Sequence, residues 1–198
     1  EVMTGFGRTG RMFACEHEAV VPDFLCLAKG LTGGYLPLAA TLTTERIYGA
    51  FLGRYEELKT FFYGHSYTGN PLACAVALAS LEVFKTEHTL ARLQPKIELL
   101  RRLLEELAVR HPRCIGAVRQ CGLIAGIDLM ENAAGARPFP WQKQTGARVC
   151  LAARAAGLLT RPIRDTLVLL PPLCITEEEL KQAVSALSHG ITSVCGPG

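Results

Sequence analysis

Two long helical segments in the middle of the chain, residues 71–87 and 89–111, most constrain the fold. Pro71 suits a first helical turn, and the residues after it are apolar or small on most sides, which predicts a buried helix. In the second segment apolar residues recur at helical spacing, and charged residues cover the opposite face, which predicts an amphipathic helix. The apolar stripe of this helix consists of Leu93, Ile97, Leu100, Leu104 and Leu107.

Short strands are predicted on both sides of these helices, because apolar runs of four to eight residues there are bounded by turn-forming residues. The expected elements are strands over 22–28, 38–43, 118–130, 158–160 and 167–170, and helices over 44–52 after a Thr44 cap, over 145–156, and from Thr176 onward after a threonine cap. Mixed strands and helices give an α/β fold class, with a boundary in the region 88–112.

Composition narrows the classes of function. The net charge of +3 is too small and too scattered for nucleic acid or an anionic membrane to be the main partner. No secretory signal is visible, and no apolar run reaches the roughly 20 residues of a spanning helix. None of the eight cysteines forms a C-x-x-C pair, which favours reduced, mostly buried thiols in a cytoplasmic protein. Cys15 and His17 have no second ligand pair, so no metal is expected.

The segment Gly5–Gly10 matches the dinucleotide-binding pattern G-x-G-x-x-G. Such a site also needs a preceding strand, a long following helix and an acid about 20 residues on. Here Pro22 ends any helix early, and the only candidate acid, Asp23, lies beside it. We therefore expect a tight turn, and a nicotinamide-binding domain is kept as an alternative.

Lys29 is the residue most indicative of chemistry. It follows an apolar run and precedes the glycine-rich loop 30–34, where partial burial would favour the neutral, nucleophilic amine. Such an amine forms a Schiff base with an aldehyde cofactor. The alternative is a lysine at the end of a strand with its amine in solvent.

Three phrases between Gly5 and Phe84 resemble the class III aminotransferases: GFGRTGRMFACEHE, PDFLCLAKGLTGGYLPLAATLTTERIY and FFYGHSYTGNPLACAVALASLEVF. The later phrase LTRPIRDTLVLLPPLCIT is similar to the C-terminal domain of the same family. The resemblance implies the C-terminal part of a type I pyridoxal-phosphate-dependent transferase fold. Residues 1–95 would belong to the large cofactor domain, and 96–198 would form a small α+β C-terminal domain.

The resemblance also implies the cofactor residues. Lys29 would bind pyridoxal 5'-phosphate covalently and then shuttle a proton. Ser66 matches the hydroxyl residue that holds the cofactor phosphate of the neighbouring subunit, and His65 supplies adjacent backbone. The residues alone favour an ordinary helix-entry loop capped by Asn70.

Substrate residues are implied in the same way. Gly64 matches a position whose backbone meets substrate, and Arg161 matches the arginine that clamps the substrate carboxylate. Without the resemblance, Arg161 would be a solvated arginine before Pro162. Arg8 is placed near the substrate mouth, and Arg164 is assigned to solvent.

The phrase LTGGYLPLAATL is most similar to family members that convert 8-amino-7-oxononanoate to 7,8-diaminononanoate in biotin biosynthesis. This implies S-adenosylmethionine as amino donor, with lysine left open, and a homodimer with shared active sites. The alternatives are another class III aminotransferase acting on an ω-amino acid and a non-catalytic remnant. The first residues resemble mid-chain sequence, and the family's aspartate for the pyridine nitrogen would precede Glu1, so we expect this chain to be inactive or nearly so alone.

Overall fold

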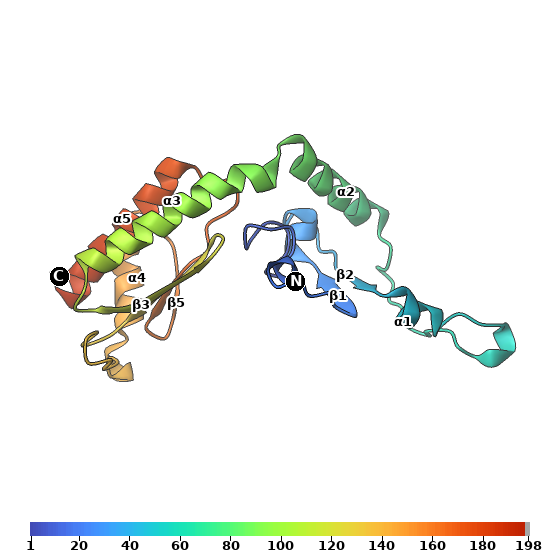
Figure 1. Ribbon diagram of the computed structural model, residues 1–198, viewed down its shortest axis with the longest axis horizontal. Coiled ribbons are helices and arrows are strands. Elements are labelled where there is room, and N and C mark those ends of the chain that lie inside the picture. Colours follow the sequence, from blue (N-terminus) through green and yellow to red (C-terminus); the bar gives the residue numbers. More distant parts are fainter. Residues whose placement is uncertain (197–198) are drawn as a thin grey trace. The chain divides into compact units, whose positions relative to one another are not determined.

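The computed structural model describes residues 1–196, which fall into two compact units, the first Glu1–Ala91 and the second from Arg92 onward (Figure 1). Helix α3 (Thr89–Arg110) begins in the first unit and continues into the second. The assignment of 1–95 to a cofactor domain and 96–198 to a small domain stays a prediction.

The first unit is built around one antiparallel strand pair and one long helix. Strands β1 and β2 pair in register from Phe24 opposite Thr43 to Leu27 opposite Ala40, within the segments where strands were predicted. The elements in chain order are η1 (Ala14–His17), β1 (Phe24–Leu27), η2 (Lys29–Thr32), β2 (Ala40–Thr43), α1 (Glu45–Gly49), η3 (Tyr55–Glu57) and α2 (Pro71–Thr86).

The core of the first unit is small. Phe6, Leu27, Leu31 and Ala77 are buried against one another. Only Ala73 and Ala77 of α2 are buried, so the expectation of a helix buried on most sides is wrong for this chain. The physical reason is that η2 is the main element packed against α2, and it covers only one face of the helix.

The start of α1 also differs from expectation. Thr44 is the residue before the helix, but its side chain accepts no hydrogen bond from the first turn. Its hydroxyl is buried without a partner. The threonine cap predicted here is therefore wrong, although the helix itself begins where a cap would place it.

Aromatic side chains gather on an exposed stretch between α1 and α2. The rings of Phe51 and Phe61 meet edge to face with centroids 5.1 Å apart, and those of Phe61 and Tyr63 lie 5.8 Å apart. All three side chains are exposed. We call Phe51, Phe61 and Tyr63 the aromatic strip.

The second unit is a four-stranded antiparallel sheet with three helices. Its strand order is β3-β4-β6-β5. The expected strand over 158–160 is wrong: Thr160 instead donates its side-chain hydroxyl to the Val168 carbonyl. The elements are the rest of α3, β3 (Ile115–Cys121), β4 (Ile124–Leu129), η4 (Trp141–Lys143), α4 (Thr145–Ala155), β5 (Pro162–Ile163), β6 (Thr166–Leu169) and α5 (Glu177–Cys195).

The apolar stripe predicted for α3 forms much of the core of the second unit. Its members are almost fully buried, except for Ile97, which is half-buried. The buried members of the stripe are Leu93, Leu100, Leu104 and Leu107.

Helix α5 is the second large contributor to this core. Thr176 accepts a hydrogen bond from the Glu179 amide at 3.2 Å, which confirms the predicted cap. Helices α4 and α5 lie in close contact. At the contact, a Cβ added to Gly190 would lie 2.6 Å from the Val149 carbonyl oxygen, so the two backbones approach at a glycine.

All eight cysteines are free thiols, but only Cys114 and Cys150 are buried. The expectation that most thiols are buried is therefore wrong, and three of them are exposed. No helix within residues 1–196 combines the length and the apolar character needed to cross a membrane.

Candidate active site

Lys29 stands at the junction of β1 and η2. Its φ is 46°, in the left-handed region that side chains other than glycine seldom adopt. The turn that follows is closed by two backbone hydrogen bonds, from the Gly33 amide to the Gly30 carbonyl and from the Gly34 amide to the Lys29 carbonyl, each 3.2 Å long. Gly33 and Gly34 are left-handed as well, which glycine adopts freely.

The Lys29 side chain lines a cavity of about 790 Å³ in the first unit. The side chain is exposed, so the burial expected from the sequence is not found in this chain. The cavity opens between the loop after β1 and the turn before α2. Its other lining residues are Ala28, Thr32, Gly34, Leu36, Pro37, Leu38, Ala39, His65, Tyr67, Thr68 and Gly69.

The turn before α2 is shaped by its own side chains. The His65 amide donates to the Thr68 hydroxyl, and the Tyr67 amide donates to the His65 imidazole Nδ1, both at 3.2 Å. Asn70 then accepts from the Ala73 amide at 3.0 Å and caps α2. The helix-entry loop capped by Asn70 is therefore confirmed, and the role of this segment toward a cofactor stays a prediction.

Of the predicted cofactor residues, the structure brings Lys29 and His65 to one cavity. Ser66 and Gly64 belong to the same loop and are exposed, but they do not line the cavity. Thr68 does line it, although sequence reasoning did not single it out. The available signal was its place in the phrase GHSYTGN, two residues after Ser66.

Arg161 lies in the second unit, immediately before β5. It is exposed and lines a separate cavity of about 510 Å³, whose walls are mostly apolar. An arginine beside an apolar groove can bind a carboxylate while the groove holds an aliphatic chain. The apolar walls include Leu158, Leu159, Leu169, Leu170 and Ile175.

Arg8 lies in the glycine-rich loop and does not line the Lys29 cavity. It is half-buried, and this burial lowers the pKa of its guanidinium. The loop is followed by the short η1 and not by the long helix that a dinucleotide site needs.

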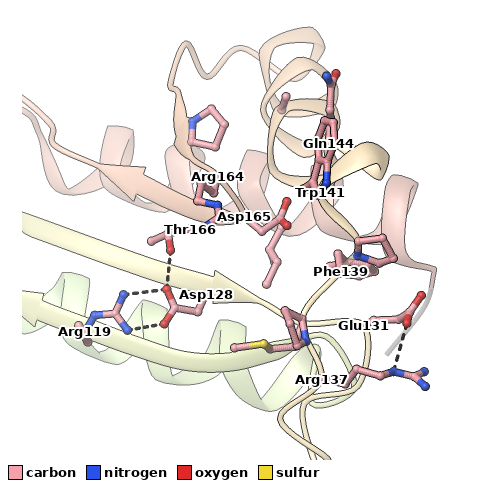
Figure 2. A pocket seen from close by; sticks show the side chains of 16 residues that line it. Arg119, Asp128, Glu131, Arg137, Phe139, Trp141, Gln144, Arg164, Asp165 and Thr166 are labelled. Carbon is pink, nitrogen blue, oxygen red and sulfur yellow. Dashed lines mark hydrogen bonds and ion pairs between the residues drawn. The ribbon is translucent and has the colours of Figure 1, made fainter.

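A larger cavity of about 1170 Å³ lies in the second unit, between the sheet and the start of α4 (Figure 2). Of its carboxylates, Asp128 accepts from Arg119 and from the Thr166 hydroxyl. The hydrogen bonds from Arg119 hold the Asp128 pKa below its usual value. Arg164, expected to be solvated, is exposed at the rim of this cavity.

The remaining acids of the larger cavity are engaged too. Glu131 is paired with Arg137 at 3.1 Å (Figure 2) and with Lys143 at 2.6 Å. Asp165 accepts from the Gly146 amide at 2.8 Å. These bonds join the loop after β4 to η4, and the turn between β5 and β6 to the start of α4. Within residues 1–196, moreover, no three histidine, cysteine or acidic side chains are grouped as a metal ion would need.

Comparison with known proteins defines the class. The family model described as aminotransferase class-III matches residues 1–191. This chain therefore belongs to the class III aminotransferase family, and the predicted α/β fold class is confirmed.

The chain is similar to proteins named adenosylmethionine-8-amino-7-oxononanoate aminotransferase. The one from Geobacter sulfurreducens is 51% identical over 197 residues, which are 99% of this chain and 43% of that relative. The one from Aquifex aeolicus is 53% identical over 192 residues, which are 96% of this chain and 42% of that relative. The crystal structure of the protein of that name from Methanocaldococcus jannaschii matches with a TM-score of 0.92 at 45% identity, over 98% of this chain and 45% of that one. This chain spans less than half the length of these relatives.

Proposed function

We propose that this chain is the C-terminal part of a pyridoxal-phosphate-dependent aminotransferase. The proposed reaction transfers an amino group from S-adenosylmethionine to 8-amino-7-oxononanoate and gives 7,8-diaminononanoate for biotin biosynthesis. The observation that carries the proposal is the placement of Lys29, a left-handed lysine that lines a cavity with the His65–Gly69 turn. The names of relatives about half identical to this chain supply the substrates.

The residues of the cavity fit the cofactor. Its size lies in the range of small-molecule sites, which is about 300–1,000 Å³. None of its described lining residues carries a carboxylate that would repel a phosphate, and Lys29 supplies the amine that an aldehyde cofactor needs. Pyridoxal phosphate, when bound, supplies the electron sink for labilising a bond at the substrate carbon.

The chain's own residues then have distinct tasks. Lys29 Nζ would hold the cofactor through its aldehyde carbon and, once displaced by a substrate amine, would take and return the proton at the substrate carbon. Within this chain Lys29 is exposed, so any exclusion of water around its amine has to come from other parts of the assembled enzyme.

Ser66 and His65 would contribute to phosphate binding across a homodimer with shared active sites. Ser66 is exposed and outside the lining of the Lys29 cavity, which supports a role toward a neighbouring subunit's cofactor. Gly64, beside them, would present its backbone to substrate. The proposal includes both the cofactor site and the homodimer. It also includes a cytoplasmic location for the enzyme.

Arg161 would bind the carboxylate of 8-amino-7-oxononanoate. The apolar groove beside it matches the aliphatic chain that this substrate carries behind its carboxylate. Arg8, half-buried in its loop, stays a proposed neighbour of the substrate mouth. A class III aminotransferase for another ω-amino acid is the second candidate, since solved transaminases about 30% identical to this chain share its fold.

The experiment uses the complete gene product beside its Lys29→Ala variant, with Lys85→Ala as control. Lys85 is another exposed lysine of the same unit, paired only with Glu82 on its own helix. The absorbance of lysine-bound cofactor should be present in the wild type and in the control, and absent in Lys29→Ala. Bleaching by S-adenosylmethionine would identify the donor, whereas a response to lysine alone would change it. Equal absorbance in all three proteins would refute the role of Lys29.

A further inference from the structure

Apart from Arg8, the glycine-rich loop Gly5–Gly10 has no part in the function proposed so far, yet it is firmly folded. Phe6 lies within it and is 3% exposed. Its backbone is left-handed, with φ of 58°, and its amide donates to the Met12 carbonyl at 2.7 Å. Gly7 donates to the Arg11 carbonyl at 3.1 Å, which closes the loop beside Phe6. A large aromatic residue is thus fixed in an uncommon conformation and directed inward.

Phe6 is directed at the residue next to Lys29. A Cβ added to Gly30 would lie 2.8 Å from Phe6 Cβ and 3.0 Å from Phe6 Cδ2, and the nearest atoms around it all belong to Phe6. Real Cβ atoms essentially never approach so closely, so the Phe6 side chain occupies the space that a side chain at position 30 would need. The contact exists only because residue 30 is glycine.

Other elements hold the same peptide. Ser80 of α2 donates its hydroxyl to the Gly30 carbonyl at 3.4 Å. Thr32, 1% exposed, donates its hydroxyl to the Leu36 carbonyl at 2.6 Å and fixes the far end of the turn. A strained backbone conformation persists only where several surrounding contacts hold it in place. Here the left-handed residue is Lys29, and the adjoining Gly30 is restrained by Phe6, by α2 and by the turn.

We infer that Phe6 is a positioning residue for Lys29. The glycine-rich loop holds the Phe6 side chain against Gly30. This contact keeps the neighbouring Lys29 in its left-handed conformation, with its side chain directed into the cavity. The inference rests on the proposed function, because the direction of the Lys29 side chain matters for catalysis only if this lysine binds the cofactor. It assigns a mechanical task to the G-x-G-x-x-G pattern. Gly5 and Gly7 allow the loop to turn tightly on either side of Phe6.

The test compares two Phe→Leu variants in the complete gene product. Phe6→Leu replaces the flat ring, whose Cδ2 lies 3.0 Å from a Cβ placed on Gly30, with a smaller branched side chain that keeps only Cβ and Cγ in place. Phe84→Leu is the control, since Phe84 packs in the same cluster with its ring 6.4 Å from that of Phe6. Both variants replace a ring of this cluster with leucine, and only Phe6 supplies the atoms nearest to Gly30. If Phe6→Leu does not fold, Ser80→Ala is the milder second variant, because it removes the hydrogen bond on the other side of the same peptide.

The first readout needs no cofactor. Hydrogen exchange is followed for the Gly33 and Gly34 amides in the cofactor-free protein, since these amides close the turn around Lys29. Phe6→Leu should speed their exchange by about tenfold over Phe84→Leu, because local opening becomes easier. Equal exchange in the two variants would overturn the inference.

The second readout is the pH titration of the absorbance of lysine-bound cofactor, with the single-turnover rate measured beside it. Phe6→Leu should shift the titration midpoint and slow the turnover by about a hundredfold, since a displacement on the order of 1 Å costs about that much. Phe84→Leu should keep the wild-type midpoint. A wild type with no such absorbance would sink the proposed function, while faster exchange in Phe6→Leu alone would still support the positioning.

Discussion

Gly190→Ala should lower the unfolding free energy of the second unit, because the added Cβ would force α4 and α5 apart. The added Cβ would lie 2.6 Å from the Val149 carbonyl oxygen and 3.1 Å from the Ala153 amide nitrogen. The first distance is 0.8 Å short of ordinary contact, which begins at 3.4 Å. Both neighbouring atoms are backbone in a helix, so neither can rotate away, and the helices must separate.

The size of the effect follows from two opposing contributions. Overpacking costs about 1–3 kcal/mol, and a clash with backbone belongs at the upper end. Alanine is a better helix former than glycine by about 1 kcal/mol, which offsets part of this. The expected net loss is about 2 kcal/mol of unfolding free energy.

Urea unfolding followed by far-ultraviolet circular dichroism measures this loss. Ser185→Ala is the control, because Ser185 is exposed on the same helix, and its change should stay within about 0.5 kcal/mol. If Gly190→Ala is as stable as the control, or more stable, then the two helices do not approach at this glycine and the reasoning is refuted.

Three further predictions concern capping, acid stability and activity. Thr176→Ala should lower the unfolding free energy by about 1 kcal/mol, whereas Thr44→Ala should be neutral or slightly stabilising because the Thr44 hydroxyl has no partner; thermal melts distinguish the two. The Glu1 carboxylate accepts hydrogen bonds from Thr4 and from backbone amides, and although burial alone would raise its pKa, these bonds lower it to about 2. A lowered folded-state pKa means stability that is present above the unfolded value near 4.5 and lost as pH falls toward 2, so acid titration of Glu1→Gln should lack this dependence. The 198-residue chain alone should show little or no transamination of 8-amino-7-oxononanoate in a steady-state assay, because no acid lines the Lys29 cavity to hold a pyridine nitrogen; strong turnover would contradict this.

Local signals predicted the elements that depend on local physics. The spacing of the leucines in α3 identified its buried face, and Thr176 with Glu179 identified the start of α5. Thr44 carries the same cap signal, but its hydroxyl is enclosed without a partner, and no local pattern reports that. The degree of burial of α2 was also missed, since a helical pattern does not say how many neighbours a helix will have.

The candidate site was predictable only in part. Resemblance to a family singled out Lys29 and His65, and the structure places both at one cavity. Thr68 was missed because nothing in a turn's sequence tells which of its side chains faces a cavity. The contact of Phe6 with Gly30 could not be predicted either, because it joins residues 24 positions apart through tertiary packing, and the glycines around Phe6 predicted only a tight turn.

The aromatic strip of Phe51, Phe61 and Tyr63 has a practical consequence for handling the protein. Contiguous apolar surface of this kind promotes self-association in solution. We therefore expect the 198-residue chain to self-associate to an extent that depends on concentration, salt and detergent. Light scattering has to accompany every binding or activity measurement on this chain. A cavity that is blocked in an aggregate gives no signal, and neither does a cavity that cannot catalyse the reaction.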